Sequence, residues 1–486
     1  MSPDTSTEVN TDLGDELAHR VAGTVLTPAD AEYGEAVRIW NGMIVKRPAL
    51  VVRPASGGQA AEDVSAAVQL AGRHGLPVSV RSGGHNIAGT ALADGGVTVD
   101  LSRLRDVHVD PELRTATVGA GCRLGDVDRE TQRHGLAVPL GFVSRVGVAG
   151  LALGGGLGYL TRRFGWTVDN LLEVQIVTAD GAVRRAAADE HPDLFWAVRG
   201  AGANLGVVTR LTFRLHPVGP LIHGGLIAWP FERAAEVLRA YRRLTATAPR
   251  ELAVWCVLLV APPAPFVPAP WHGRKLCAMA VCDSGPPERA PQALAPLRAI
   301  PDPVFDLVEP MPYTAVQSYL DDTEPDGMHY YWRTEYLPGL DDGLLDTLTA
   351  MFTSCPMPLG ELGLLHIGGA LNERAEDDGA VGNRDARFVV GVKGMWHADD
   401  PGAERYRAWV RDGGDLVRPF GTGRTYVNFQ TDDEGDLRAR ATYGANLPRL
   451  IAVKRRYDPG NVFRSNRNIA PDDAAGPVTG VRPRNS

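Results

Sequence analysis

One glycine turn with a single histidine constrains this chain more than any other stretch. The turn is the run 81–89 (RSGGHNIAG), which follows directly on the short apolar stretch 78–80. Paired glycines let the backbone adopt positive φ and approach a ligand closely, and successive N–H groups in such a turn form an anion-binding nest. The turn therefore predicts a phosphate-bearing cofactor held by backbone amides and touched by the ring of His85. Taken alone, it fits a solvent-exposed loop with an incidental histidine equally well.

Two further glycine-rich segments favour the ligand-binding interpretation. The run 147–158 (GVAGLALGGGLG) has six glycines in twelve residues and otherwise only small or aliphatic residues, whereas flexible linkers carry Ser, Thr or charge. It is not the dinucleotide fingerprint, because no βαβ unit with an acidic residue about 20 positions on frames it. The third segment, 199–209 (RGAGANLGVVT), ends a helix-like stretch and opens a strand. Three such segments predict a large ligand packed against backbone.

Together with the run 457–466 (YDPGNVFRSN), these motifs resemble those of one flavoprotein family. The family is the berberine-bridge-enzyme-like oxidases of the vanillyl-alcohol-oxidase superfamily, and the bacterial branch with hydroxynicotine oxidase and actinobacterial polyketide-tailoring oxidases is most similar. The resemblance covers roughly residues 25–470. It implies an α+β fold with a two-subdomain FAD-binding domain and a substrate domain whose antiparallel sheet is covered by helices.

The resemblance also implies that FAD is bonded covalently to a ring nitrogen of His85. Further FAD contacts are expected from the matching motifs, with Asn428 and Asn468 as outer flavin contacts. The predicted cofactor-binding residues are Arg81, Ser82, Gly83, Gly84, Asn86, Gly89, Gly147, Gly150, Gly154, Gly155, Gly156, Gly158, Gly202, Gly206 and Val208.

One position departs from many relatives, which carry a second covalent link through a cysteine in a G-x-C-P-x-V-G stretch. The matching run here, 141–147, reads GFVSRVG, so Val143 stands where the thiol would be. A valine forms no thioether, and the resemblance then implies FAD held singly, through His85. Cys122 lies in a different motif and is predicted to be a small buried side chain.

Two residues are matched to the reacting end of the flavin. Tyr426 matches the tyrosine of a Y-x-N motif and is the candidate proton acceptor. A phenol has an ordinary pKa near 10, so this role needs a neighbouring cation or the flavin itself; the alternative is a hydroxyl that only caps a buried carbonyl. Val146 matches a position that gates oxygen access in relatives, where valine goes with oxidase behaviour; the alternative is a packing residue.

Four segments of the second half carry signatures that match the substrate side of the family: 330–336, 366–370, 388–396 and 426–429. The run 330–336 (YYWRTEY) reads as a strand with Tyr330 and Trp332 on one face and Arg333 and Glu335 on the other. A core strand with a solvent-facing ion pair explains the same run. His366 is a candidate, although a satisfied buried histidine is the more frequent case. Lys393 interrupts an apolar alternation and fits either a sheet-edge charge or a pocket cation.

Composition limits the partners. A net charge of −8 and a pI near 5.9 argue against nucleic acid, because no basic face is evident. Five cysteines without metal-ligand spacing predict neither a disulfide framework nor a metal site and favour the cytoplasm. No apolar run long enough for a signal peptide or membrane span is present. The expected partners are a small-molecule substrate and oxygen, with the chain a monomer or homodimer.

Changes in composition predict the domain boundaries. Residues 1–20 are predicted to be a disordered tail, 21–217 the FAD-binding domain and 218–436 the substrate domain. Residues 437–475 are predicted to return to the FAD domain, and 476–486 to form a loose tail.

The predicted activity is an FAD-dependent oxidase. It removes hydride from a C–H next to oxygen or nitrogen in a secondary-metabolite-type substrate, and oxygen is reduced to hydrogen peroxide. An Ala-, Arg-, Gly- and Pro-rich composition similar to that of actinobacterial proteins favours this substrate class by analogy. The alternatives are a flavin–oxygen-adduct monooxygenase or oxidative cyclase of a polyketide, an oligosaccharide or alcohol oxidase, and a binding protein that has lost the cofactor.

Overall fold

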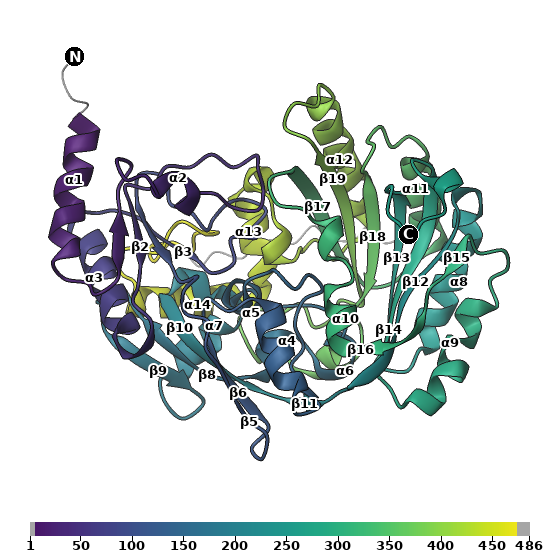
Figure 1. Ribbon diagram of the computed structural model, residues 1–486, viewed down its shortest axis with the longest axis horizontal. Helices are drawn as coiled ribbons and strands as arrows, with labels where there is room; N and C mark the ends of the chain where they lie inside the picture. Colours follow the sequence, from purple (N-terminus) through teal and green to yellow (C-terminus); the bar gives the residue numbers. More distant parts are fainter. Residues whose placement is uncertain (1–4, 474–486) are drawn as a thin grey trace.

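The computed structural model describes residues 5–473, which form a first domain at the left of Figure 1 and a large sheet at its right. The first subdomain has a four-stranded sheet in the order β1-β2-β4-β3. Strands β2, β4 and β3 are parallel, and β1 pairs antiparallel with β2 at the edge. Its elements are β1 (Thr24–Leu26), β2 (Leu50–Arg53), α3 (Ala60–Arg73), β3 (Val78–Arg81) and β4 (Val97–Asp100). Because β3 ends at Arg81, the histidine turn starts at the carboxyl end of a parallel strand, where α/β sheets bind ligands.

The N-terminal segment corrects the predicted disorder of residues 1–20. Residues 5–18 form helix α1 (Thr5–Ala18), and Leu13 and Leu17 are buried. Residues four apart lie on one face of a helix, so this pair anchors α1 in the same apolar core that holds α3. Residues 1–4 and the predicted loose tail at 476–486 lie outside the described residues.

The second subdomain is an antiparallel sheet in the order β5-β6-β10-β8-β9. Its strands are β5 (Val107–Asp110), β6 (Thr115–Gly119), β8 (Leu171–Val177), β9 (Val183–Ala187) and β10 (Val207–Arg214). Its helices are α4 (Leu124–Gln132), α5 (Val148–Leu153) and α7 (Pro192–Ala201). The second glycine segment thus forms the short helix α5, and the third joins α7 to β10.

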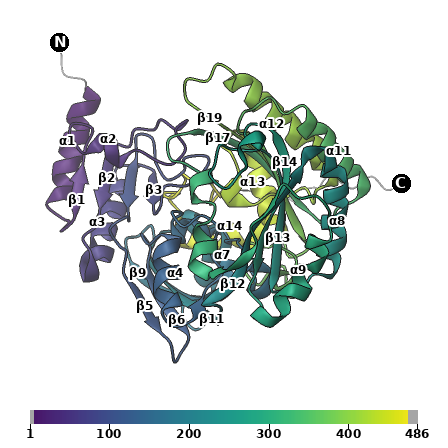
Figure 2. The ribbon, with the colours of Figure 1, turned by 45° about the vertical axis from the view of Figure 1, so that its right-hand side comes forward.

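The second half of the chain forms the antiparallel sheet β15-β12-β14-β13-β18-β19-β17, with β16 beside β12. Its strands are β12 (Leu221–Pro230), β13 (Leu252–Val260), β14 (Lys275–Asp283), β15 (Phe305–Asp306), β16 (Glu309–Pro312), β17 (His329–Leu337), β18 (Glu361–His366) and β19 (Phe388–Trp396). The outer face is covered by α8 (Ala234–Thr247), α9 (Ala290–Arg298), α11 (Asp342–Thr353) and α12 (Ala403–Val417). Figure 2 shows these helices on the side away from the first domain. The predicted α+β fold with a helix-covered antiparallel sheet is confirmed.

The last described segment returns to the first domain. Helix α13 (Asp436–Tyr443) is followed by α14 (Leu447–Tyr457), which lies beside α7 (Figure 1). Leu450 and Ile451 belong to the same buried cluster as Val64 and Val118 of the first domain. Short elements complete the fold: α2 (Tyr33–Ala36), α6 (Thr161–Phe164), α10 (Tyr313–Ser318) and the pair β7 (Leu136–Ala137) and β11 (His216–Pro217).

Within residues 5–473, no helix combines the length and the apolar character needed to cross a bilayer.

Candidate functional site

One cavity brings the three glycine segments together with the inner face of the large sheet, the face turned toward the first domain. Residues 426–429 and 465–467 of the C-terminal part complete its lining. The predicted residues that line it are Ser82, Gly83, Gly84, His85, Asn86, Val146, Gly147, Gly150, Gly154, Gly206, Val208, Trp332, Tyr426 and Asn428.

The first two glycine segments cross in direct backbone contact. A Cβ added to Gly83 would lie 2.3 Å from the Gly147 nitrogen, and one added to Gly147 would lie 2.2 Å from the Gly83 nitrogen. These distances are far below van der Waals contact, so neither position accepts a side chain. At Gly150, by contrast, an added Cβ meets no protein atom within 4 Å. At Gly150, helix α5 therefore presents backbone with no side chain, which leaves space for a flat cofactor.

Five glycines that were predicted to contact the cofactor lie outside the cavity lining, which corrects the predicted contact. Their missing side chains leave room for protein atoms, not for a ligand. The neighbours that fill these spaces are Ile44 at Gly89, Val381 at Gly155, Thr167 at Gly156, Leu140 at Gly158 and Leu153 at Gly202.

Arg81 and Asn468 also lie outside the cavity. The Arg81 guanidinium donates a hydrogen bond to the carbonyl of Ala36 and lies 3.9 Å from Asp100, in a groove that adjoins the cavity. Asn468 is exposed. The residues just before it, 465–467, line the cavity instead.

His85 lies where the histidine turn meets the aromatic wall. Its ring stacks on Trp40 with centroids 5.3 Å apart, and Trp40 in turn stacks on Tyr330 at 3.8 Å. Burial lowers the pKa of His85 to about 4, and the positive charges of Arg145 and Arg123 act in the same direction. The imidazole is therefore neutral at physiological pH, the form in which a ring nitrogen carries a free lone pair.

The position matched to the second covalent link offers no thiol. Val143 and Val146 both line the cavity, and the described lining contains no cysteine. Cys122 is buried with its sulfur 3.5 Å from the carbonyl oxygen of Asp106, and burial raises the pKa of its thiol to about 12. The sulfur is unreactive in that state.

Tyr426 is buried between the second glycine segment and the sheet. Its hydroxyl oxygen accepts hydrogen bonds from the Gly156 N–H at 3.0 Å and from the Asn428 amide at 2.9 Å. Burial raises the pKa of Tyr426, and the hydrogen bonds from Asn428 and Gly156 only partly oppose this shift. No cation contributes to that shift among the described residues, so the predicted proton-accepting role of Tyr426 depends on help from the flavin itself.

Strand β17 divides its predicted substrate residues between two faces. Trp332 lines the cavity, and Tyr330 supports Trp40 from behind while its hydroxyl donates to the Pro325 carbonyl at 2.6 Å. Tyr330 itself does not reach the cavity, which corrects its predicted contact with substrate.

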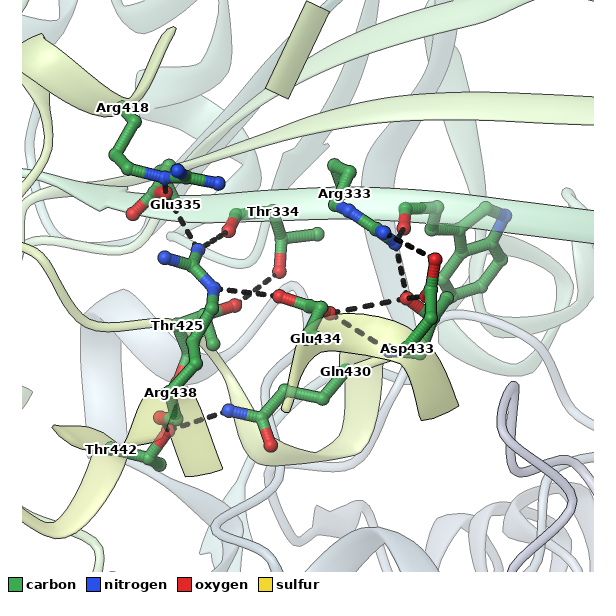
Figure 3. A network of polar contacts seen from close by, with 12 residues as sticks. Arg333, Thr334, Glu335, Arg418, Thr425, Gln430, Asp433, Glu434, Arg438 and Thr442 are labelled. Carbon is green, nitrogen blue, oxygen red and sulfur yellow. Dashed lines mark hydrogen bonds and ion pairs between the residues drawn. The ribbon is translucent and has the colours of Figure 1, made fainter. Parts of the chain in front are cut away.

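Arg333 and Glu335 point the other way and form ion pairs with the C-terminal segment (Figure 3). Arg333 lies 2.8 Å from Asp433, and Glu335 lies 2.6 Å from Arg438. Period-two alternation directs both away from the cavity. Their predicted substrate role is therefore corrected to holding residues 433–438 against the free edge of β17.

His366 is also a structural residue. It belongs to the outer face of β18, where its ring stacks on Phe388 at 4.9 Å. Burial lowers its pKa to about 2, helped by the charges of Arg162 and Arg387. It does not line the cavity, so the predicted substrate contact is corrected.

Lys393 is paired with Glu324, a cavity residue that the sequence did not single out. It does not line the cavity itself, but its ammonium forms an ion pair with Glu324, lies 3.6 Å from Glu361 and lies 5.6 Å from the Trp332 ring centre. Burial lowers the pKa of Lys393, and the two carboxylates outweigh this and raise it. Burial raises the pKa of Glu324, and Lys393 opposes that shift. Glu324 does line the cavity. It stands in an acidic loop, 321–326, and nothing in such a run distinguishes a buried carboxylate from solvated ones.

Two parts of the chain match described families. Residues 48–187 match the family described as "FAD binding domain", and residues 425–470 match "Berberine and berberine like". Both matched parts contribute to the cavity.

Whole-length relatives point the same way. The chain is 32% identical to (R)-6-hydroxynicotine oxidase of Paenarthrobacter nicotinovorans over 463 residues, which cover 93% of this chain and 97% of that protein. The crystal structure of 6-hydroxy-D-nicotine oxidase from Arthrobacter nicotinovorans superposes with a TM-score of 0.82 at 29% identity, covering 93% of this chain and 98% of that one. Physcomitrella patens BBE-like 1 gives a TM-score of 0.84 at 25% identity, with 95% and 100% covered.

Proposed function

Since this chain belongs to the berberine-bridge-enzyme-like family of FAD-linked oxidoreductases, we propose that it is an oxidase whose FAD is bonded to His85 alone. The position of His85 carries the proposal. It lies in the wall of the cavity that the FAD-domain glycine segments form, and its neutral ring is able to act as a nucleophile. Val143 in place of a thiol supports a single attachment.

The lining of the cavity supports a dinucleotide that lies against backbone. Its walls are backbone at Gly83, Gly147 and Gly150, and its lining also includes the end of β3 and residues 465–467. When bound, FAD supplies a two-electron acceptor that oxygen reoxidises. The protein's contribution is to hold that acceptor, to exclude water with the wall around Trp332, and to orient a substrate carbon.

The substrate end of the cavity is aromatic. Trp40, Phe142, Trp332 and Phe429 line it, and such a wall favours a flat or ring-containing molecule. The proposed reaction is the oxidation of a C–H next to oxygen or nitrogen, with the electrons passing to oxygen as hydrogen peroxide. Hydroxynicotine oxidase, an oxidase by its name, supports this reaction class.

Acid precipitation of the purified protein tests the attachment. We expect a yellow pellet and a colourless supernatant for the wild type. His85→Ala should bind FAD but release it into the supernatant, while the exposed His134→Ala should behave as the wild type does. Free flavin in the wild-type supernatant would refute a covalent bond.

Peroxide stoichiometry separates an oxidase from a monooxygenase or oxidative cyclase. We expect one hydrogen peroxide for each oxygen consumed when the protein oxidises a substrate found in a panel of ring-containing alcohols and amines, hydroxynicotine among them. A yield well below one would favour incorporation of oxygen into the product.

A further inference from the structure

Glu324 is the only carboxylate in the described lining of the cavity. The structure holds its backbone from two sides. Its carbonyl accepts a hydrogen bond from the Trp40 indole at 3.1 Å and another from Arg145 at 3.0 Å. Because Trp40 stacks on His85, this carboxylate lies close to the histidine end of the cavity.

Two buried polar atoms in this wall have no protein partner. Glu324 uses Oε1 for Lys393, while Oε2 accepts no hydrogen bond within the described residues. The indole Nε1 of Trp332, whose ring centre lies 5.6 Å from the Lys393 ammonium, likewise donates to nothing described. A buried polar group without a partner is destabilising, and both atoms belong to residues that line this cavity, so an unpartnered acceptor and an unpartnered donor here indicate a ligand that satisfies both.

We propose that Glu324 and Trp332 recognise the substrate through a hydrogen-bond-donating group, a hydroxyl or an amine, presented to this end of the cavity. The inference rests on the proposed function only in taking this cavity as the substrate site. A carboxylate accepts and never donates, and an indole N–H donates and never accepts. A hydroxyl satisfies both groups, an ammonium satisfies Glu324 alone, and a carboxylate substrate is repelled by Glu324.

Lys393 is the positioning residue of this site. It lies behind the carboxylate, between Glu324 and the more exposed Glu361, and does not line the cavity. Its ammonium fixes Oε1 and leaves Oε2 as the free acceptor. Glu361 shares the same lysine without reaching the cavity, and it therefore serves as the matched control.

The test uses three probes that share one ring and differ in their polar group: benzylamine, benzyl alcohol and benzoate. Each is titrated into the flavin-loaded holoenzyme at neutral pH, and binding is followed by the change in flavin absorbance. For the wild type we expect benzylamine and benzyl alcohol to bind and benzoate not to bind.

Two variants then separate the two groups. Glu324→Gln should weaken benzylamine by about tenfold or more, as the loss of a desolvated charge partner does, and should admit benzoate. It should change benzyl alcohol little, because the glutamine oxygen still accepts a hydrogen bond. Trp332→Phe should weaken benzyl alcohol and leave benzylamine unchanged. Glu361→Gln should match the wild type with all three probes.

Several outcomes would overturn the inference. The inference is wrong if the wild type binds benzoate as tightly as benzylamine. This outcome needs no variant, so the test stays valid if Glu324→Gln fails to fold. The inference is also wrong if a folded Glu324→Gln protein keeps the wild-type probe preference. It is wrong as well if none of the three probes changes the flavin absorbance of the wild type. Flavin content is measured separately, so failure of the proposed function registers as colourless protein and not as altered preference.

Discussion

The two ends of the cavity are built from different materials. At the cofactor end, glycine backbone reaches the cavity: Gly83 and Gly147 are in contact through their main chains, and Gly150 presents no side chain. The substrate end is made of side chains, in which Trp332 and Glu324 are held by Trp40 and Lys393. A backbone wall recognises what every FAD shares, whereas a side-chain wall is free to change with the substrate. The difference predicts that substitutions at the cofactor end cause loss of the flavin, whereas substitutions at the substrate end change the preference between substrates.

The largest effect is expected from filling the glycine crossing. Gly83→Val would place a branched side chain where a Cβ alone lies 2.3 Å from the Gly147 nitrogen. Because both partners are backbone, no rotamer relieves the clash, and we expect aggregated or flavin-free protein. Expression yield and flavin absorbance measure this. Gly58→Val, whose added Cβ meets nothing within 4 Å, is the control; full flavin loading in Gly83→Val would contradict the crossing.

A smaller effect is expected on the outer side of β17. Arg438 bridges the buried carboxylates of Glu335 and Glu434 at 2.6 Å each. Arg438→Met removes the cation that the two share and leaves Glu335 only the half-exposed Arg418 at 3.8 Å, and we expect a loss of about 3–5 kcal/mol in the free energy of unfolding. Denaturant unfolding measures the loss, with the exposed Arg243→Met as control. Probe preference should stay unchanged, because none of these residues lines the cavity; altered preference would show that the two faces of β17 are not independent.

Val146 lies beside Gly147 in the cavity wall. Val146→Leu adds a methylene to a close-packed wall, and we expect oxygen to reoxidise the reduced protein ~10-fold more slowly, or about 1.4 kcal/mol in activation free energy. Stopped-flow mixing of reduced protein with oxygenated buffer measures this. Flavin content should not change. Equal reoxidation rates in the wild type and in Val146→Leu would show that Val146 only packs against its neighbours.

The smallest effect is an expected absence of pH dependence. A histidine with its ordinary pKa near 6.5 would lose nucleophilic neutral ring as the pH falls below that value. The pKa of His85 is lowered to about 4, so its ring stays neutral until the pH approaches that lower value. Ionisation of His85 should therefore leave the rate of covalent attachment to flavin-free protein unchanged between about pH 5.5 and 8. A rate that halves near pH 6.5 would contradict the burial of this ring.

At the cofactor end, the motifs single out His85, Gly83 and Gly147, and all three line the cavity. A local backbone reason or a covalent one favours a single residue type at each of these positions. Alternation along 330–336 correctly separated Trp332 from Arg333. It did not tell which face meets the cavity, because a period of two is symmetric until another layer packs on one side.

Local sequence therefore determined the glycine turns, the strand that delivers His85 and the absence of a thiol at Val143. Only the tertiary structure decided that Glu324 is buried in the cavity and that Glu335 and His366 are not. Glu324 comes from a loop, Lys393 from β19 and Trp332 from β17, and no local pattern encodes their meeting. The physical reason is that a charged side chain is buried only where another element supplies its partner, and that partner is chosen by the packing of segments far apart in the chain.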